Sequence, residues 1–215
     1  MAPNHKSVKL YYFAGRGRAE HIRQLLKLAN VKFEDVIIEQ ETWPTFKDDM
    51  PLGQVPVLEV DGVKIGQSLA ISRFIAHEYG LAGENALENA RLDMIADLVQ
   101  DATYSDGIKL WPMVLLGFIQ VPDKEAYFKE KVRPSLDNYA SLFEKFLVEN
   151  GNQTLLGGDK VTWVDVLAAE FFSKFVDFGE KDCLEAYPHI QNLIDRIHNL
   201  PAIRKHIDAR SKTLA

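Results

Sequence analysis

Apolar and polar residues alternate over residues 7–13, and this alternation, with its aromatic enrichment, predicts a β-strand. Glycines interrupt the pattern at residues 14–17. From Arg18 the apolar positions recur at the spacing of a helix, which Asn30 can end. Residues 33–38 predict a second strand. A strand, a helix and a strand in this order form a βαβ unit, whose strands normally run parallel with a right-handed crossover.

Two short apolar runs, residues 57–60 and 63–65, are joined by Asp61 and Gly62. An Asp-Gly pair between two such runs predicts a tight antiparallel hairpin, because both central residues of that turn need a positive φ angle. Residues 39–50, which precede the hairpin, are polar and irregular in pattern, so we expect a loop there.

The segments on either side of this hairpin also have predictable features. Val55-Pro56 precedes the first strand, and because X-Pro is the only common place for a cis peptide bond, the backbone there is expected to bend sharply. After the second strand, residues 69–79 predict a helix, with Ser68 as its N-cap and Gly80 at its end. The predicted order of this part is β-α-β-loop-β-β-α.

Helical spacing of apolar residues dominates the rest of the chain. We expect one domain over residues 1–80, a short polar linker over residues 81–86 and an all-helical domain over residues 87–215. Within the helical domain, Trp111-Pro112 indicates a break before a short apolar piece. A helix is expected from residue 122 to about residue 149, with Pro134 as a kink.

Two further signals define the last helices. Thr162 and Asp165 have the spacing of a capping box in front of an apolar run, and this signature marks the start of a helix. Its role is in folding and not in chemistry. Pro188 is expected to open another helix, and Pro201 to end it.

Composition narrows the classes of function. The 215 residues are 47% hydrophobic and 26% charged, as in ordinary soluble proteins, and the net charge of −6 argues against a nucleic-acid partner. No apolar run reaches the roughly 20 residues that a membrane span needs. The N-terminus lacks a signal-peptide core, so we expect a cytoplasmic protein, with non-classical release left open. The single cysteine, Cys183, and the scattered histidines predict no metal site.

Tyr12 is the first candidate for chemistry. It lies at the carboxyl end of the first predicted strand, beside a glycine turn, and ligands often bind at such strand ends. Its phenol could donate a hydrogen bond to an anion, with Arg18 in support. The alternative is a strand tyrosine whose hydroxyl lies at the surface, and spacing alone favours that alternative. Gly15 and Gly17 do not form a dinucleotide fingerprint, so no nucleotide site follows.

Two other places could bind the rest of a ligand. The bent Val55-Pro56 loop and the helix start at Ser68 would offer backbone amides, which suit an extended, peptide-like ligand with a carboxylate. An ordinary hairpin followed by a capped helix explains the same residues equally well. Trp43 and Lys47, in the polar loop, could clamp the far end of a ligand, or Trp43 could simply cover the edge of the core.

Taken together, these motifs resemble the glutathione transferase family, closely the Sigma class and most of all the Sigma-like (Nu) enzymes of nematodes. The residues that carry the resemblance are Tyr12-Phe13-Ala14-Gly15-Arg16-Gly17-Arg18-Ala19-Glu20, Trp43-Pro44, Gly53-Gln54-Val55-Pro56-Val57-Leu58 and Gln67-Ser68-Leu69-Ala70-Ile71. The resemblance covers nearly the whole chain. It implies an α/β thioredoxin-like N-terminal domain, of βαβαββα type with a cis peptide before Pro56, joined to an all-α C-terminal domain in a homodimer.

The resemblance also implies roles for single residues. Tyr12 matches the catalytic tyrosine and Arg18 the arginine beside it. Gln54 stands where several Sigma members carry lysine, so one contact with the glycyl carboxylate would be neutral here. The implied glutathione-binding residues are Tyr12, Trp43, Lys47, Gln54, Val55, Gln67, Ser68 and, reaching across the dimer, Asp101.

A second implied site would bind the electrophile beside Tyr12. Its implied residues are Phe13, Gly15, Thr103, Tyr104, Ile108 and Leu214. Some Sigma members hold a divalent ion between subunits with three aspartates of the helix that carries Asp101. Gln100 replaces one of those aspartates here, so no metal is expected.

The implied reaction is conjugation of the glutathione thiolate to hydrophobic electrophiles in detoxification, with reduction of lipid hydroperoxides as a further activity. A thiol with a pKa of about 8.5 needs roughly 2.7 kcal/mol to lower that pKa by two units. One hydrogen bond to a charged acceptor contributes about 1.5–3 kcal/mol, so Tyr12 could supply much of the shift. The alternatives are a glutathione-dependent prostaglandin D synthase, and a carrier of haem or similar hydrophobic ligands with little catalysis.

Overall fold

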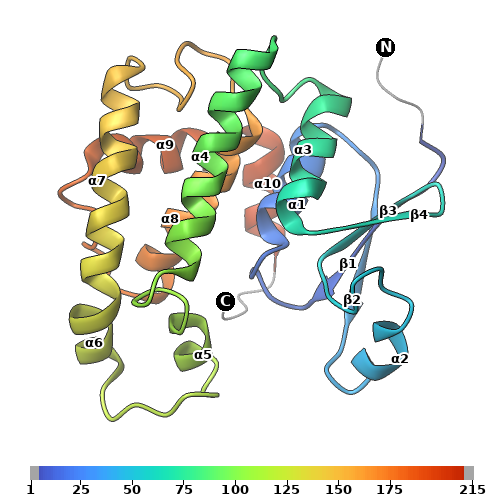
Figure 1. The fold of residues 1–215 in the computed structure, drawn as a ribbon, viewed down its shortest axis with the longest axis horizontal. Coiled ribbons are helices and arrows are strands. Elements are labelled where there is room, and N and C mark those ends of the chain that lie inside the picture. Colours follow the sequence, from blue (N-terminus) through green and yellow to red (C-terminus); the bar gives the residue numbers. More distant parts are fainter. Residues whose placement is uncertain (1–4, 211–215) are drawn as a thin grey trace. The chain divides into compact units, whose positions relative to one another are not determined.

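The computed structural model describes residues 5–210, which its contacts divide into two compact units. The first unit comprises residues 5–82 together with residues 201–210, and the second comprises residues 83–200. The predicted helical domain therefore differs from the second unit at its end, because the last helix packs with the first unit. Each unit is described by itself below, with the element labels of Figure 1.

A four-stranded sheet forms the centre of the first unit, in the order β2-β1-β3-β4. Its strands are β1 (Val8–Phe13), β2 (Glu34–Ile38), β3 (Val57–Val60) and β4 (Val63–Gly66). β1 and β2 run parallel, as the βαβ pattern predicted, while β3 is antiparallel to both β1 and β4. The hairpin prediction is confirmed, since Asp61 and Gly62 have φ angles of 50° and 87°. The Val55–Pro56 peptide bond is cis, as expected.

Four helices complete this unit: α1 (Glu20–Leu28), α2 (Trp43–Lys47), α3 (Ser68–Tyr79) and α10 (Pro201–Ala209). α1 packs against α3 and against α10 (Figure 1). α1 ends before Asn30, whose φ of 54° is left-handed, and α3 ends at Gly80, with a φ of 75°. Both helix ends were predicted from the sequence.

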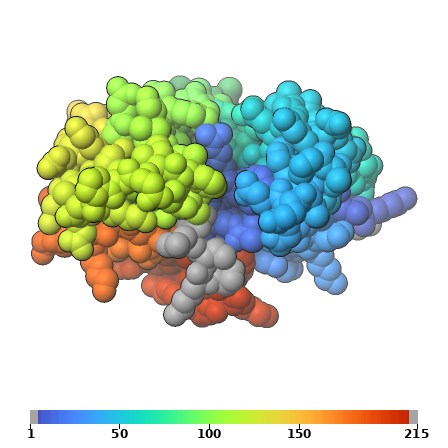
Figure 2. All heavy atoms as spheres, turned by 90° about the horizontal axis from the view of Figure 1, so that it is seen from below, coloured from blue at the N-terminus to red at the C-terminus, as the bar shows by residue number. Residues whose placement is uncertain are grey.

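Two local predictions for this unit were wrong, and the interpretation of Pro201 was incomplete. The expected loop over residues 39–50 contains α2, a short helix with proline in its first turn and no buried residue, and Figure 2 shows this light-blue segment at the surface of its unit. Ser68 is the first helical residue of α3, and the N-cap is Gln67. Pro201 does not only end a helix, because it also opens α10. Proline favours the first turn of a helix, where its missing N–H has no partner to lose.

The second unit is entirely helical. Its elements are α4 (Ala86–Tyr104), α5 (Trp111–Leu115), α6 (Lys124–Tyr127), the π-helical turn η1 (Phe128–Val132), α7 (Arg133–Glu149), α8 (Trp163–Phe178) and α9 (Pro188–His198). α8 contacts both α4 and α9, and its residues from Trp163 to Ser173 are buried, so it forms the core of the unit. The capping box at Thr162 and Asp165 is confirmed. An α/β thioredoxin-like unit with an all-helical unit confirms the predicted fold class.

In the second unit, too, the structure at two prolines differs from the prediction. Trp111-Pro112 starts α5 and does not mark a simple break. At Pro134 the expected irregularity is present as η1, the π-helical turn that ends just before Arg133. A wider turn there removes the clash that a proline ring makes with the carbonyl four residues earlier. Among residues 5–210, no helix has the length and apolar character that a membrane span requires.

Candidate functional site

Strand register places four predicted ligand-binding segments at one end of the sheet. Tyr11 pairs with Val57, and Val57 pairs with Gly66. The carboxyl end of β1, the cis peptide before β3 and the start of α3 after β4 therefore lie at the same edge. β2 also ends there, because Phe13 pairs with Ile38, and the chain then leads into α2. Segments that are far apart in sequence thus surround the end of β1.

Tyr12 faces a tight glycine turn at this edge. Its phenol oxygen accepts a hydrogen bond from the backbone N–H of Arg18 at 3.0 Å. Gly17 has a φ of 37°, and a Cβ atom at that position would lie 2.2 Å from the phenol oxygen. Arg18 thus contacts the phenol through its main chain, and the supporting role of its exposed side chain stays a prediction. Because the phenol accepts this bond, its own hydrogen remains available for a ligand.

Gly17→Ala is expected to displace the phenol of Tyr12 and, if that phenol has the catalytic role that the resemblance implies, to lower kcat about three- to tenfold, because small misplacements of a reacting group are costly. Gly62→Ala is the matched control. Gly62 also has a positive φ, of 87°, but a Cβ there meets nothing within 4 Å. Both substitutions strain the backbone, but only Gly17→Ala brings a Cβ atom against the phenol of Tyr12. Steady-state kinetics of the two variants therefore distinguish the effect of the clash from that of the strain. Equal activity losses in the two variants would contradict this reading.

Tyr11, the neighbour of Tyr12, has a different environment. Successive strand residues point to opposite faces of a sheet. The Tyr11 hydroxyl donates a hydrogen bond to Glu59 at 3.1 Å. Burial, with this bond and the charge of Glu59, raises the pKa of Tyr11 to about 12. The phenol of Tyr11 is therefore engaged within its own unit, and Tyr12 alone of the pair faces the glycine turn.

The α2 segment lies against the same edge. The rings of Phe13 and Trp43 meet edge to face, with centroids 5.7 Å apart. A Cβ on Gly53 would lie 3.7 Å from Cε of Lys47, so the lysine stem runs beside the loop that precedes the cis peptide. Gln54 is exposed and Val55 is half-buried in that loop.

Gln67, the N-cap of α3, has a strained backbone. Its φ of 69° and ψ of 114° lie in a region that L-residues rarely adopt. Such strain costs about 1–3 kcal/mol and often occurs where a ligand binds. Sequence reasoning missed this strain, because nothing in the residue types signals it. The next residue, Ser68, opens the 12-residue helix α3, whose first amides favour an anion.

Asp101 and the predicted electrophile-site residues are divided between the two units. Asp101 lies in the second unit, where it lines a hollow between α4 and α7 with Asp93 and Asp97. The hydroxyl of Thr103 donates to the Val99 carbonyl at 2.8 Å, in the same helix. Tyr104 is exposed, whereas Ile108 is buried. Phe13 and Gly15 belong to the first unit, and Leu214 lies outside the described residues.

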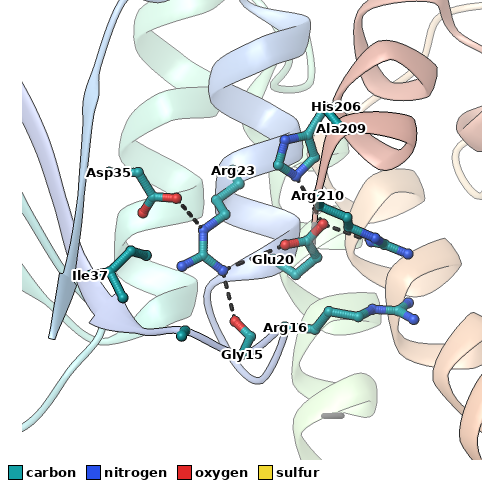
Figure 3. A pocket seen from close by; sticks show the side chains of 10 residues that line it. Gly15, Arg16, Glu20, Arg23, Asp35, Ile37, His206, Ala209 and Arg210 are labelled. Carbon is teal, nitrogen blue, oxygen red and sulfur yellow. Dashed lines mark hydrogen bonds and ion pairs between the residues drawn. The ribbon is translucent and has the colours of Figure 1, made fainter. Parts of the chain in front are cut away.

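A buried charged cluster lies next to the glycine turn, and sequence reasoning did not predict it. Figure 3 shows Glu20 and Arg23 of α1 together with His206 and Arg210, around a cavity of about 290 Å³. Glu20 accepts hydrogen bonds from His206 at 2.9 Å and from Arg210 at 2.7 Å. Burial alone would raise the pKa of the Glu20 carboxyl, but these two partners and their charges hold that pKa well below its usual value. Among residues 5–210, no group of acidic, histidine and cysteine side chains could hold a metal ion.

The low pKa of Glu20 predicts an acid-sensitive contribution to stability. Below about pH 4.5 the unfolded chain takes up a proton at Glu20 before the folded chain does. The free energy of unfolding therefore falls by up to about 1.4 kcal/mol for each pH unit of acidification. Glu20→Gln should be less stable by about 1–2 kcal/mol at neutral pH, and the difference should shrink as the pH falls. Denaturant unfolding at several pH values measures it. Glu84→Gln, at an exposed ion pair with Lys160, is the control, and a pH-independent difference for Glu20→Gln would contradict the prediction.

Comparisons with known proteins show which family the chain resembles in sequence. The family described as glutathione S-transferase, N-terminal domain, matches residues 7–77, and the corresponding C-terminal domain family matches residues 115–210. A probable glutathione S-transferase of Caenorhabditis elegans, gst-36, is 53% identical over 96% of this chain and 98% of its own. The hematopoietic prostaglandin D synthase of Gallus gallus is 39% identical over 98% of both chains.

Solved nematode structures share the fold. A Nu-class glutathione transferase from Haemonchus contortus has a TM-score of 0.84 at 35% identity, covering 97% of this chain and 99% of that one. The structure of Na-GST-3 from the hookworm Necator americanus, described as monomeric, has a TM-score of 0.90 at 36% identity, covering 96% and 98%. These likenesses extend over both units of the chain.

Proposed function

The chain belongs to the glutathione S-transferase family, and we propose that it joins the thiolate of glutathione to hydrophobic electrophiles, as in detoxification. The observation that carries this proposal is the placement of Tyr12, whose phenol oxygen lies 3.0 Å from the Arg18 amide beside the cis peptide and the start of α3. Residues 1–80 would bind glutathione, and residues 87–215 would supply most of the electrophile site and the dimer contacts. We expect this activity in the cytoplasm.

In this mechanism Tyr12 donates its phenol hydrogen to the sulfur of glutathione. A hydrogen bond to an anionic acceptor favours the thiolate by about 1.5–3 kcal/mol, which lowers the pKa of a thiol by about one to two units. The Arg18 amide, by donating to the phenol oxygen, makes that hydrogen a better donor. The chain needs no cysteine at the site, because the reacting thiol belongs to glutathione.

The remaining residues at the edge would hold the tripeptide. The Val55 main chain would pair with its cysteinyl unit, as one more strand pairs with a sheet edge. Gln67 and Ser68, at the start of α3, would bind the γ-glutamyl carboxylate. Trp43, Lys47 and Gln54 would bind the glycyl end. These assignments are supported by the shared edge of the sheet.

Two measurements on the purified chain test the proposal. Isothermal calorimetry should detect binding of glutathione, and a chloronitrobenzene substrate should be conjugated at a rate that saturates with glutathione. Binding without conjugation of any aryl halide, epoxide or unsaturated aldehyde would overturn the catalytic part of the proposal. Absence of both would overturn the whole of it. Hydroperoxide reduction and haematin binding remain predictions, to be measured with the same protein.

Prostaglandin D synthase activity is the second candidate. The 39% identity to the hematopoietic prostaglandin D synthase of Gallus gallus, over nearly the full length of both chains, favours it. The isomerisation would use the same thiolate, held by Tyr12. Incubation with prostaglandin H₂ and glutathione, followed by product chromatography, separates the two functions. Prostaglandin D₂ formed much faster than any conjugate would make the isomerase the main activity.

We also propose a homodimer through the face shared by α4 and α7. Met94 and Leu142 line the hollow on this face and are 50% and 41% exposed, so a partner subunit seated there would cover apolar surface from both helices. Asp101 lies on the same face, from which it would reach the amino group of glutathione bound to the partner. Sedimentation velocity decides between this dimer and a monomer, the state described for the hookworm relative. A monomer that still conjugates glutathione would remove the role of Asp101.

A further inference from the structure

The buried guanidinium of Arg23 holds the loop that carries Tyr12. Nη1 of Arg23 donates to the carbonyl of Gly15 at 2.8 Å, and Nη2 donates to the carbonyl of Phe13 at 3.3 Å. The guanidinium carbon lies 5.8 Å from the centre of the Tyr12 ring. Arg23 is only 5% exposed, which limits competition from water for these bonds. One side chain thus fixes two carbonyls immediately beyond the reactive tyrosine.

Two carboxylates hold this guanidinium in turn. Nε of Arg23 donates to Asp35 of β2 at 2.8 Å, and Nη1 lies 3.5 Å from Glu20. Glu20 is also the acceptor for His206 and Arg210, so it connects Arg23 with the last helix and the residue that follows it (Figure 3). The contacts therefore run without interruption from α10 through α1 to the glycine turn.

We propose that Arg23 is a positioning residue for Tyr12, and that α10 fixes its orientation through Glu20; this inference rests on the proposed function. The planar fork of arginine matches the requirement, because it reaches two carbonyls and two carboxylates at once. Lysine would keep the charge but would lose this geometry. Arg18 and Arg23 thus hold the turn from two sides, Arg18 through its amide on the phenol and Arg23 through the backbone next to Tyr12.

Positioning and simple stabilisation predict different kinetics. The hydrogen bonds of Arg23 go to Phe13, Gly15, Glu20 and Asp35. None of these contacts involves α2, the cis peptide or the start of α3, where glutathione would be held. A loosened turn should therefore disturb the phenol-to-sulfur contact and leave the affinity for glutathione nearly unchanged. A purely stabilising residue would change the melting temperature but neither kcat per folded molecule nor the titration of the bound thiol.

Arg23→Lys is the first test. We expect kcat per folded molecule to fall about five- to tenfold, with KM for glutathione within about twofold of wild type. The titration of the bound thiol, followed by ultraviolet absorbance of the thiolate, should move upward by about half to one pH unit. Arg133→Lys is the matched control, because Arg133 is ion-paired with Asp137 and Glu180 in the second unit. It should show wild-type kcat and titration.

Asp35→Asn is the second variant, for use if Arg23→Lys does not fold. It removes the carboxylate charge from the exposed end of the network and leaves Arg23 in place. The thiol titration should again move upward, by a smaller amount. An unchanged titration and kcat in the variants that fold would overturn the inference while wild-type conjugation remains. If wild type itself conjugates no electrophile, the proposed function fails and the inference fails with it.

Discussion

Tyr12→Phe is expected to lower kcat for conjugation about 10- to 100-fold, because the variant would lose the proposed hydrogen bond to the glutathione thiolate, which contributes about 1.5–3 kcal/mol. The phenylalanine ring fills the same space in the turn, so the fold and the affinity for glutathione should survive. Stopped-flow or steady-state kinetics with an aryl halide give the first quantity, and calorimetry gives the second. The loss should be largest near neutral pH, where thiol ionisation limits the rate, and smaller in alkaline solution.

Tyr11→Phe is a closely matched control for this substitution. It removes the same hydroxyl from the neighbouring residue of the same strand, where the partner is Glu59 and not the glycine turn. Its kcat should stay within about twofold of wild type. If both variants kept wild-type turnover, or if Tyr11→Phe lost as much activity as Tyr12→Phe, the assignment of the thiolate's hydrogen-bond donor would be wrong.

Local sequence signals predicted the parts of the fold that depend on a few neighbouring residues. The positive φ angles at Asp61-Gly62 and the capping box before α8 are examples, because each follows from residue types within four positions. Proline gave less reliable signals. Pro201 was interpreted only as the end of a helix, although proline is equally suited to the first helical turn, where it stands in α10. Proline occurs both just after a helix and in the first turn of the next one. Only the packing of the residues that follow it shows which of the two applies.

The residues of the candidate site were harder to predict from local sequence than the elements of the fold. Spacing alone favoured a surface hydroxyl for Tyr12, and the family resemblance was needed to select it as catalytic. The cluster around Glu20 could not be predicted at all, because its partners His206 and Arg210 are 186 and 190 positions away in the chain. The polar character of Glu20 and Arg23 on the buried face of α1 was the only available signal. Long-range ion pairs of this kind need the fold before they can be seen.

Asp165→Ala should give a large loss of stability, about 3–5 kcal/mol of unfolding free energy. Asp165 is fully buried and accepts hydrogen bonds from the amide of Leu155 at 2.8 Å and from the amide and hydroxyl of Thr162, each at 2.7 Å. Alanine would leave these buried donors without an acceptor, and each costs about 1–3 kcal/mol when unsatisfied. The start of α8, the core helix of its unit, would lose its cap.

The exposed N-cap Asp123 provides the comparison that identifies the cause. It accepts from two amides of α6 but lies at the surface. Water can replace it there, so Asp123→Ala should cost only about 0.5–1 kcal/mol. Denaturant unfolding of the two variants, followed by tryptophan fluorescence, gives the difference. Similar losses of unfolding free energy in both variants would mean that Asp165 stabilises the protein only as an ordinary helix cap. The expected gap of at least about 2 kcal/mol assigns the larger cost to the buried donors that only Asp165 satisfies.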